Sequence, residues 1–375
     1  MCGICGKWNF DGQPITEAGL RQMCRSIAHR GPDGEGIFLE DGLGLGSRRL
    51  SIIDLNTGDQ PISNEDQSIW IVFNGEIYNF QELRADLQRR GHHFYTLADT
   101  EVIVHLYEEY GRACVTHLRG MFAFALWDKK EQRLLLARDR VGKKPLYYRL
   151  TPTSLAFGSE IKTILTDSTV PRELDVTALH YYLSYQYVPP PYTIFKGISK
   201  LPPAHTLLCE GGEITIEPYW QLDFTQKTTL SEAEIVEQLH ELISESVRLR
   251  LISDVPLGAF LSGGIDSSLV VAVMSQLMSQ PVKTFSIGFE EDSFNELPYA
   301  RTIAQRFATE HHEFVVRPNA VEVLPELVWH FDEPFADSSA LPTYYVSKVT
   351  GDFVKVALNG DGGDESFVGY ERYLG

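Results

Sequence analysis

Hydrophobic residues in the first half of the chain gather in short runs that predict buried strands. Four such runs have the length of a strand, at 68–73 (SIWIVF), 121–127 (MFAFALW), 134–137 and 146–148. Two helices are predicted over 80–90 and 99–110; the second begins with acidic residues, and a glycine directly follows each. The first half therefore combines short strands with a few helices.

The second half of the chain alternates regularly between helix and strand patterns. A long amphipathic helix is predicted from about Ser231 to Ile252, with apolar residues near one face. Strands are then predicted up to Leu261 and over 284–289, 313–316 and 354–358, with helices after Asp266 and from about Glu296. Such alternation favours a parallel α/β sheet, whose functional groups lie at the carboxyl ends of the strands.

The stretch from about Tyr187 to Asp223 is punctuated by consecutive prolines and a Gly-Gly step. We interpret this stretch as the crossing between two domains. The length of 375 residues fits two domains that each bury a core of their own. We expect the first domain over 1–220 and the second over 221–375.

Composition and charge narrow the class of protein. Hydrophobic residues make up 43% of the chain and charged residues 22%, as in an ordinary soluble globular protein. Lys and Arg number 33 against 51 Asp and Glu, and the formal charge of -18 argues against nucleic acid as the main partner. An anionic substrate must then be held by local devices such as helix N-termini, Mg2+ or selected basic side chains.

The five cysteines are dispersed along the chain, at Cys2, Cys5, Cys24, Cys114 and Cys209. No secretory signal precedes them and no apolar run is long enough to span a membrane. We therefore expect a cytoplasmic protein without a membrane partner. The Cys2-x-x-Cys5 spacing could be half of a zinc site, but no second such pair or paired histidine accompanies it, and zinc is not expected there.

A glycine-rich loop at 260–268 (FLSGGIDSS) separates a predicted strand from a predicted helix. Its glycines allow a tight turn that exposes backbone amides, and the helix N-terminus adds a positive dipole end. Together they form a cradle suited to pyrophosphate, with Asp266 placed to bind a bridging Mg2+. The loop lacks the Gly-Lys-Ser/Thr ending of a Walker A motif. The structural alternative is a plain turn capped by Ser267.

Cys2 follows the initiator methionine directly. Removal of Met1 would place a thiol nucleophile and an α-amine on one residue. An α-amine titrates near pH ~8, so it can accept the thiol proton at neutral pH. The alternative is an ordinary cysteine at the second position.

The SGGIDSS segment resembles the PP-loop of the ATP pyrophosphatases, and together with Cys2 it makes the whole chain resemble a glutamine-hydrolysing asparagine synthetase of the bacterial AsnB type. Further matching segments occur in the family's order along nearly the full length. They are 30–33 (RGPD), 49–52 (RLSI), 74–79 (NGEIYN), 120–125 (GMFAFA), 138–140 (RDR), 144–148 (KPLYY), 158–162 (GSEIK), 332–334 (DEP) and 360–365 (GDGGDE).

The resemblance implies an α/β protein in which an Ntn-hydrolase αββα sandwich, the class II glutamine amidotransferase domain, precedes a PP-loop ATP pyrophosphatase domain with a parallel sheet. It also implies two linked reactions. Cys2 forms a γ-glutamyl thioester and releases ammonia, and water then frees glutamate. ATP activates aspartate as β-aspartyl-AMP, which ammonia converts to asparagine, with AMP and pyrophosphate as the other products.

The resemblance assigns roles in the glutaminase half. Asn74 and Gly75 would donate to the oxyanion formed by attack of Cys2, and Asn74 would also contact glutamine. Arg49 would bind the α-carboxylate of glutamine, and Glu76 and Asp99 its α-ammonium. Two structural alternatives stay open, because Asn-Gly is also a good hairpin turn and Asp99 is also a suitable acid at a helix start.

The resemblance likewise marks residues in the synthetase half. Those for ATP are Leu261, Ser262, Gly263, Gly264, Asp266, Ser267, Ile287, Gly288, Gly360 and Asp361. Those for Mg2+ are Asp266, Asp361 and Asp364. The alternatives are a plain turn for the aspartate-rich loop and ordinary buried-strand positions for Leu261, Ile287 and Gly288.

The chain departs from the family pattern near its end. Residues 359–370 read NGDGGDESFVGY, where the common pattern reads SGDGGDELFGGY, so Asn359, Ser366 and Val368 differ. Relatives that amidate other acceptors, such as cell-surface sugar acids, vary here. Family members also continue well beyond Gly375, so we expect the N-terminal portion of a longer protein, and a fragment with glutaminase activity alone stays open. Glutamine and aspartate are the expected partners, and a homodimer is possible.

Overall fold

The computed structural model describes residues 1–289, 295–317, 319–370 and 373. The chain divides into two compact units. The first unit comprises Met1–Gln226 together with Val328–Ala336, and the second comprises Lys227–Leu327 together with Asp337–Gly375. None of the helices in the described ranges is long and apolar enough to cross a membrane.

The first unit contains two six-stranded antiparallel sheets. The strands of one sheet are β1 (Gly3–Asn9), β2 (Gly34–Glu40), β3 (Leu43–Arg49), β8 (Tyr147–Thr151), β9 (Ser154–Gly158) and β10 (Ser199–Lys200), in the order β10-β8-β9-β1-β3-β2. Those of the other are β4 (Ile62–Ser63), β5 (Ile69–Ile77), β6 (Gly120–Asp128), β7 (Arg133–Arg138), β11 (His205–Glu210) and β12 (Glu213–Pro218), in the order β12-β11-β7-β6-β5-β4.

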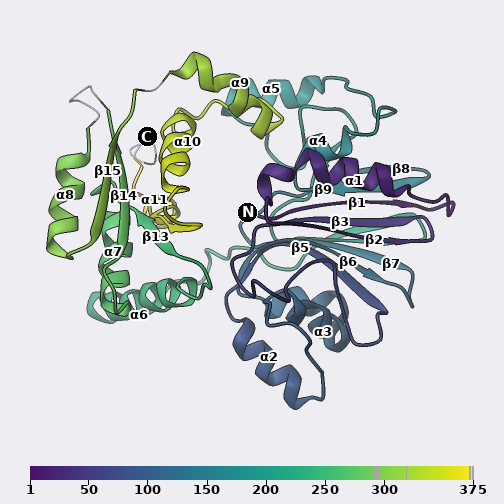
Figure 1. Ribbon diagram of the computed structural model, residues 1–375, viewed down its shortest axis with the longest axis horizontal. Helices are drawn as coiled ribbons and strands as arrows, with labels where there is room; N and C mark the ends of the chain where they lie inside the picture. Colours follow the sequence, from purple (N-terminus) through teal and green to yellow (C-terminus); the bar gives the residue numbers. More distant parts are fainter. Residues whose placement is uncertain (290–294, 318, 371–372, 374–375) are drawn as a thin grey trace. The chain divides into compact units, whose positions relative to one another are not determined.

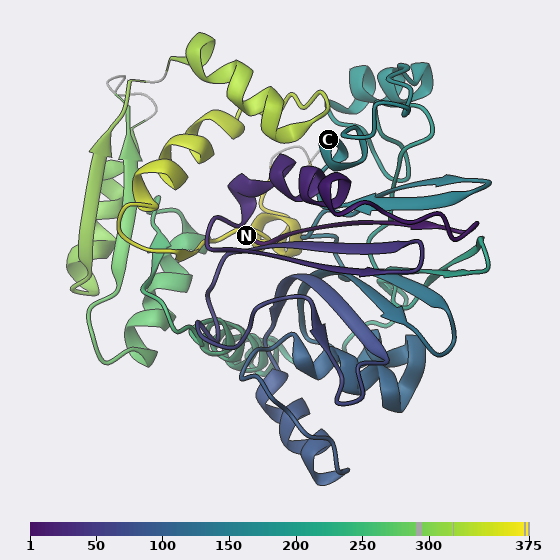
Figure 2. The same cartoon turned by 45° about the vertical axis from the view of Figure 1, so that its right-hand side comes forward.

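Helices cover the outer faces of this pair of sheets. Helices α1 (Glu17–Ser26) and α4 (Ile161–Ile164) contact the first sheet, whereas α3 (Glu101–Tyr110) contacts the second and is joined by α2 (Phe80–Arg89). Figure 1 shows α1 on one side of the two sheets and α2 and α3 on the other, and the turned view in Figure 2 shows the same layers. The predicted αββα sandwich is confirmed. The remaining elements are the 3-10 helices η1 (Ala28–Arg30) and η2 (Gly111–His117) and helix α5 (Val176–Tyr185).

The core between the sheets explains why 121–127 is apolar at every position. Ala123, Ala125 and Trp127 belong to the cluster buried between the two sheets. Phe122 and Phe124 are also fully buried, and because side chains alternate along a strand they lie on the opposite face of β6. A strand in the middle of four layers has no solvent-facing side, so it shows no polar alternation.

The predicted interdomain crossing at 187–223 is wrong. This segment contains β10, β11 and β12, and β11 pairs with β7 deep in the first unit, with Leu207 opposite Leu136. Gly211 and Gly212, both with positive φ, form the tight connection of the β11–β12 hairpin. The glycines and prolines therefore mark turns between strands, and the units divide after Gln226.

A nine-residue stretch from the second half of the sequence completes the first unit. Asp332 accepts hydrogen bonds from the Lys162 backbone N–H and forms an ion pair with Lys162 Nζ, both at 3.0 Å. Glu333 pairs with Lys200. Both lysine side chains are about nine-tenths buried, with 13% and 11% exposed, so the two carboxylates neutralise charges that water reaches poorly.

The second unit is built on a four-stranded parallel sheet in the order β15-β14-β13-β16. Its strands are β13 (Leu257–Phe260), β14 (Lys283–Gly288), β15 (Glu310–Val315) and β16 (Val356–Leu358). Its helices are α6 (Glu232–Arg250), α7 (Ile265–Leu277), α8 (Leu297–Arg306), α9 (Ala320–Phe331, whose last turn groups with the first unit), α10 (Ala340–Thr350) and α11 (Gly363–Phe367). The predicted parallel sheet is confirmed.

The topology of this sheet concentrates two loops at one place. The chain leaves β13 toward β14 and β15 on one side, and only later returns to place β16 on the other side of β13. The carboxyl ends of β13 and β16 therefore lie next to each other at a switch point, where ligands bind in open α/β sheets. The glycine-rich loop follows β13 and the aspartate-rich loop follows β16.

Candidate active sites

Cys2 lies directly before β1 and lines a pocket in the first unit. The same pocket is lined by Arg49, Gly75, Glu76 and Asp99, so the structure brings together five of the six residues predicted for the glutaminase half. These residues come from the start of the chain, the end of β3, strand β5 and the segment before α3. Residues that lie far apart in the sequence thus share one small cavity.

The Cys2 thiol is held against the backbone of Leu50. The Leu50 N–H donates to Cys2 Sγ at 3.4 Å, and the thiol lies 3.6 Å from the Leu50 carbonyl oxygen. Arg30 Nε donates to the Cys2 carbonyl at 3.0 Å and fixes the backbone on the other side. Burial raises the pKa of the Cys2 thiol, so a proton acceptor is needed to form the thiolate. Burial lowers the pKa of the Met1 α-amine to about 5, so the amine of the chain that keeps Met1 is neutral at pH 7.

Asn74 and Gly75 lie within strand β5, opposite Ala123 and Phe122 of β6, so the hairpin-turn alternative is wrong. Asn74 is fully buried, and within the described part of the chain its side-chain amide finds no hydrogen-bond partner at either Oδ1 or Nδ2. A Cβ on Gly75 would lie 2.2 Å from the Met121 carbonyl oxygen, so the close approach of the strands requires glycine. Unsatisfied buried amide groups are costly, and Asn74 directly precedes Gly75 of the pocket lining, which is consistent with a role toward a ligand.

Glu76 and Asp99 place two carboxyl groups in the same pocket. Asp99 Oδ2 accepts the Ile77 N–H at 2.8 Å, and Asp99 lies one residue before the N-cap of α3, Thr100. Burial raises the pKa of Asp99 to about 6. Burial together with the nearby Asp99 raises the pKa of Glu76 well above its usual range. Two carboxyl groups that repel each other in a desolvated pocket favour the arrival of a cationic group.

Arg49 contributes the opposite charge, and its guanidinium is already engaged. It donates to Asp59 Oδ1 at 2.8 Å, to the Ile53 carbonyl at 3.2 Å and to the Asp54 carbonyl. The Arg49 side chain is only 8% exposed whereas that of Asp59 is 83% exposed. The cation is therefore fixed by the fold, while its carboxylate partner is a surface group that can be exchanged.

The glycine-rich loop of the second unit presents backbone amides at the start of α7. The Ser262 N–H donates to Ser267 Oγ at 3.2 Å and the Gly264 N–H to Ser262 Oγ at 3.2 Å, which closes the turn. Gly263 has a φ of 86°, and a Cβ there would lie 2.5 Å from a side-chain atom of α8. The first residue of α7, Ile265, is 85% exposed. The loop is therefore an open turn of backbone and hydroxyl groups.

Three of the residues predicted for ATP, Leu261, Ile287 and Gly288, lie at the strands of the sheet. Leu261 and Gly288 are buried and Ile287 is partly buried. Leu261 bonds through its N–H to the Phe285 carbonyl at 2.9 Å, and Gly288 lies close against Leu297. This burial agrees with the structural alternative for Leu261 and Gly288, and their role toward ATP stays a prediction.

Asp266 meets the aspartate-rich loop. A Cβ added to Gly363 would lie 2.3 Å from Asp266 Cγ, and one added to Gly360 would lie 2.8 Å from Asp266 Cβ. Desolvation, together with the charges of Asp364 and Glu365, raises the pKa of Asp266. The structure therefore gathers Asp266, Asp364 and Glu365, and carboxylate oxygens of this kind suit Mg2+.

Asp361 has a different environment from the other two aspartates predicted as metal ligands. Asn359 Nδ2 donates to Asp361 Oδ2 at 2.5 Å, and both residues are exposed. Asn359 is one of the positions at which the sequence departs from the family pattern, so this departure contacts a residue of the predicted ATP site.

Comparison with known proteins identifies the family. The model of the glutamine amidotransferase domain matches residues 1–220, and the model of asparagine synthase matches residues 238–375. A Methanocaldococcus jannaschii protein, provisionally named a glutamine-hydrolysing asparagine synthetase, is 38% identical over 100% of this chain and 76% of its own length. The chain belongs to the glutamine-hydrolysing asparagine synthetase family. The predicted Ntn-type amidotransferase fold followed by a PP-loop domain is confirmed.

Other asparagine synthetase relatives are longer than this chain. Asparagine synthetase 1 of Bacillus subtilis is 41% identical over 100% of the chain, which spans 59% of that relative. The amidase chry2 of Gibberella zeae is 34% identical over 100% of the chain and 60% of its own length. The family thus includes relatives that are named for different reactions.

Two residues of these sites were given no role from the sequence. Burial lowers the pKa of Lys144 to about 8, and its charge acts on both Glu76 and Cys2. Lys144 is the first residue of the family-like KPLYY segment. Its side chain marks it as unusual because it is only 4% exposed, and the sequence alone does not show this burial. Glu365 directly follows Asp364, but only the fold shows that its charge reaches Asp266.

Proposed function

We propose that this chain performs glutamine-dependent amide synthesis of the asparagine synthetase type. Residues 1–220 would hydrolyse glutamine to glutamate and ammonia, and residues 221–375 would contribute the ATP-dependent activation of aspartate. The observation that carries the proposal is the pocket in which Cys2 lies together with Arg49, Glu76 and Asp99. These groups match the nucleophile and the two opposite charges that an amino acid substrate requires.

Binding of glutamine follows from the charges of the pocket. The α-carboxylate of glutamine would replace Asp59 on the guanidinium of Arg49, and the α-ammonium would lie between Glu76 and Asp99. The ammonium then relieves the repulsion between the two carboxylates. Such an arrangement selects a free amino acid and places its side-chain amide toward Cys2.

Hydrolysis proceeds through the thiol of Cys2. After removal of Met1, the neutral α-amine of Cys2 takes the thiol proton. The resulting thiolate attacks the glutamine amide carbon. The amide of Asn74 and the N–H of Gly75 would donate to the oxyanion, which gives the unsatisfied Asn74 side chain its partner. The amine returns the proton to the leaving nitrogen, ammonia departs, and water cleaves the γ-glutamyl thioester to glutamate.

In the second unit, ATP would bind with its phosphates on the amides of the glycine-rich loop. Attack of the aspartate β-carboxylate on the α-phosphate forms β-aspartyl-AMP and releases pyrophosphate. Ammonia then displaces AMP and gives asparagine. Asp266 and Asp364, with Asp361, would hold Mg2+, which neutralises phosphate charge when it is bound.

The five cysteines are all unpaired, which supports a reducing cytoplasmic setting.

A second candidate is amidation of a carboxylate other than aspartate. Asn359, which differs from the family pattern, bonds to Asp361 beside the proposed ATP site. The 34% identity to a fungal protein named an amidase also favours testing other acceptors.

The deciding experiment uses this chain with amide-15N glutamine, Mg-ATP and aspartate, with products followed by mass spectrometry. We expect 15N-asparagine and AMP to appear together. In Asp266→Asn we expect AMP formation to disappear while glutamate release continues. Labelled ammonia without AMP would restrict the activity to the glutaminase half, and AMP with a different amide product would identify another acceptor. Normal AMP release from Asp266→Asn would refute the role of Asp266.

A further inference from the structure

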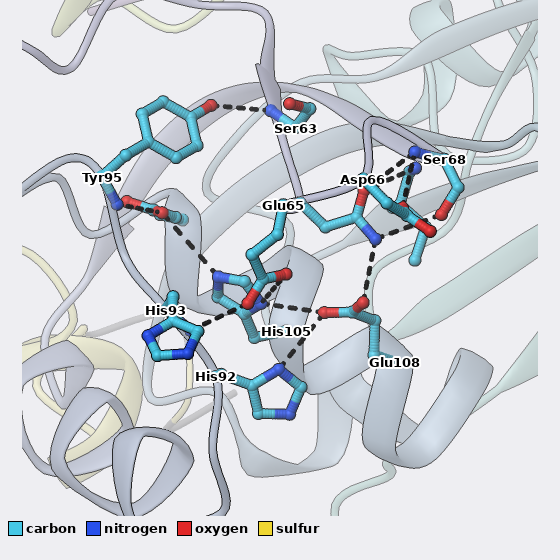
Figure 3. A network of polar contacts seen from close by, with 12 residues as sticks. Ser63, Glu65, Asp66, Ser68, His92, His93, Tyr95, His105 and Glu108 are labelled. Carbon is cyan, nitrogen blue, oxygen red and sulfur yellow. Dashed lines mark hydrogen bonds and ion pairs between the residues drawn. The ribbon is translucent and has the colours of Figure 1, made fainter.

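A cluster of histidine and glutamate side chains lies in the first unit, outside the residues used by the proposed reaction. Glu65 comes from the turn between β4 and β5, His92 from the loop after α2, and His105 and Glu108 from successive turns of α3. One ligand atom of each residue lies within 4.8 Å of those of the other three. Figure 3 shows the four side chains pointing toward one another.

We infer that Glu65, His92, His105 and Glu108 form a binding site for a divalent transition-metal ion, for which Zn2+ is the best match. Two imidazole nitrogens and two carboxylate oxygens are a ligand set that zinc accepts in four-coordinate sites. The side chain of His105 is fully buried, so this ligand is held in place by the fold. The side chain of Glu65 is 37% exposed, so an ion can reach the site from solvent. This inference does not depend on the proposed function.

The distances between the inward-facing atoms fit such a site. His105 Nδ1 lies 2.8 Å from Glu108 Oε2 and 3.7 Å from Glu65 Oε2, and His92 Nδ1 lies 3.4 Å from Glu108 Oε2. Zinc with bonds of ~2.0–2.2 Å places tetrahedral ligand atoms roughly 3.3–3.6 Å apart. The four atoms therefore need only small side-chain movements to share one ion.

The outward-facing atoms of the two histidines provide an independent argument. A histidine that binds a metal almost always directs its other ring nitrogen to a carboxylate, a carbonyl or water. Here His92 Nε2 lies at hydrogen-bond distance from Glu109 Oε1, 3.1 Å. His105 Nε2 faces Glu101 Oε1 at 3.7 Å, which is an ion-pair distance and too long for a hydrogen bond. A proton on each Nε2 would leave both Nδ1 atoms free to face the cluster as ligands.

The two glutamates are supported in the same way. Asn64 Nδ2 donates to Glu108 Oε1 at 2.8 Å, and the backbone N–H of His93 donates to Glu65 Oε1 at 2.8 Å. In each carboxylate one oxygen is therefore held by a neighbour, while the other oxygen faces the histidines. Three of the four ligands, Glu65, His92 and Glu108, therefore have an outer hydrogen-bond partner.

The charge of the cluster suits a divalent cation. Glu109 is paired with Arg90 at 3.1 Å, and Glu101 lies 3.7 Å from Arg84, so these outer carboxylates have cationic partners of their own. The carboxylates of Glu65 and Glu108 face the two histidines. A divalent ion bound with neutral histidines would neutralise both carboxylates.

The site would join three separate segments of the first unit. It links the β4–β5 turn, the loop after α2 and helix α3. The same loop continues to the segment in which Tyr95 and Thr96 donate to Glu101, and then to Asp99 of the glutamine pocket. A bound ion would therefore stabilise the part of the chain that carries one wall of that pocket.

The test is metal binding by the chelator-treated chain. We expect one high-affinity Zn2+ per chain by titration calorimetry, a higher melting temperature with Zn2+, and the visible absorption of tetrahedral Co2+ on substitution. Glu65→Ala and His92→Ala should each weaken Zn2+ binding by at least about tenfold and remove the Co2+ absorption. His93→Ala removes an exposed histidine next to the site that is not one of the four, and it should bind as the unaltered chain does.

Several outcomes would overturn the inference. The absence of stoichiometric Zn2+ binding by the unaltered chain would leave the cluster as an ion-pair network. Unchanged binding by both Glu65→Ala and His92→Ala would place the ion elsewhere. The Co2+ spectrum of the unaltered chain tests the geometry even if a variant fails to fold. Because the readouts are binding and stability, they stay interpretable if the chain proves to hydrolyse no glutamine.

Discussion

The pocket around Cys2 and the glycine-rich loop at 260–268 differ in which groups they offer to a charged ligand. In the pocket, the ionisable side chains of Arg49, Glu76 and Asp99 surround a half-buried thiol. In the loop, Ser262, Gly264 and Ile265 are exposed at the start of α7, and Asp266 lies near the acids Asp364 and Glu365. The first site combines side chains of both signs, as the proposed binding of glutamine requires, and the second offers a helix N-terminus, as the proposed binding of phosphate requires.

This difference shows where each site is sensitive to change. A buried side-chain charge is costly without its partner, so the pocket responds to the protonation and pairing of single groups. A backbone cradle depends on the conformation of the chain, so the loop responds to what its glycines allow.

The largest effect is expected from Cys2→Ala, which removes the nucleophile. Glutamate release should fall by about 10^3-fold or more, because the other pocket groups bind glutamine without replacing the thiol. ATP binding in the second unit should be unchanged, as measured by calorimetry. The other four cysteines are buried, so iodoacetamide should label the native chain once and the variant not at all. A folded Cys2→Ala variant with normal glutaminase activity would show that Cys2 is not the nucleophile.

The next largest effect contrasts two glycines. Gly75→Ala would drive a Cβ to 2.2 Å from the Met121 carbonyl, whereas Gly362 of the aspartate-rich loop has open space but a φ of 99°. We expect Gly75→Ala to destabilise the first unit by ~1–3 kcal/mol and to reduce glutaminase kcat/KM by more than tenfold. Gly362→Ala should cost ~1–2 kcal/mol through backbone strain and leave glutaminase intact. Thermal melts with glutamate assays separate the two, and equal glutaminase loss in both would contradict the steric argument.

A pH dependence is expected for the pocket. Asp99, with a pKa of about 6, is ionised at pH 7 and protonated at pH 5, and only the ionised form attracts an ammonium group. Glutamine binding to Cys2→Ala, which separates binding from turnover, should therefore weaken as pH falls through about 6, by up to ~10-fold per pH unit. Because the pKa of Asp99 is raised from 3.8 to about 6, its ionisation lowers the stability of the free protein as pH rises from about 4 to about 6. Because glutamine binds more tightly to the ionised form, it should raise the melting temperature more at pH 7 than at pH 5. Asp99→Asn should show neither trend; a trend that survives in this variant would assign the titration to another group.

The smallest effect is expected from the exchangeable partner of Arg49. Asp59→Asn removes a carboxylate that competes with glutamine, and exposed ion pairs are worth ~0.2–1 kcal/mol, so binding should tighten by roughly 1.4- to 5-fold. Glu131→Gln, which breaks the exposed pair with Arg133 at 2.9 Å, is the matched control and should leave binding unchanged. Weaker glutamine binding in Asp59→Asn would show that Asp59 positions Arg49 instead of competing for it.

The sequence predicted the elements whose pattern is local. The run at 121–127 became β6 because both faces of that strand are covered, and the alternation after Ser231 became a parallel sheet. The stretch at 187–223 was misjudged because prolines and glycines mark hairpins as readily as linkers. The roles of the predicted site residues stay predictions, although the fold brings most of the glutaminase set together.

What the sequence could not show is proximity between distant segments. Glu65, His92 and the pair on α3 come from three elements, and nothing in their spacing resembles a metal motif. Nothing in the sequence distinguishes Lys144 from other lysines, and only the structure shows that it is buried. In both cases the chemistry arises from neighbours that the chain supplies tens of residues away.

The return of Val328–Ala336 to the first unit has a practical consequence for dissecting the molecule. Asp332 and Glu333 pair with Lys162 and Lys200, so a gene fragment cut near residue 220 would remove one carboxylate from each of these poorly hydrated ammonium groups. Lys162 would keep its pair with Glu160, whereas Lys200 would lose its carboxylate partner. Neither half can be isolated cleanly by a single cut, since the chain passes from one unit to the other, back, and out again. Co-expressed pieces or a grafted peptide covering 328–336 would be needed to study the glutaminase half alone.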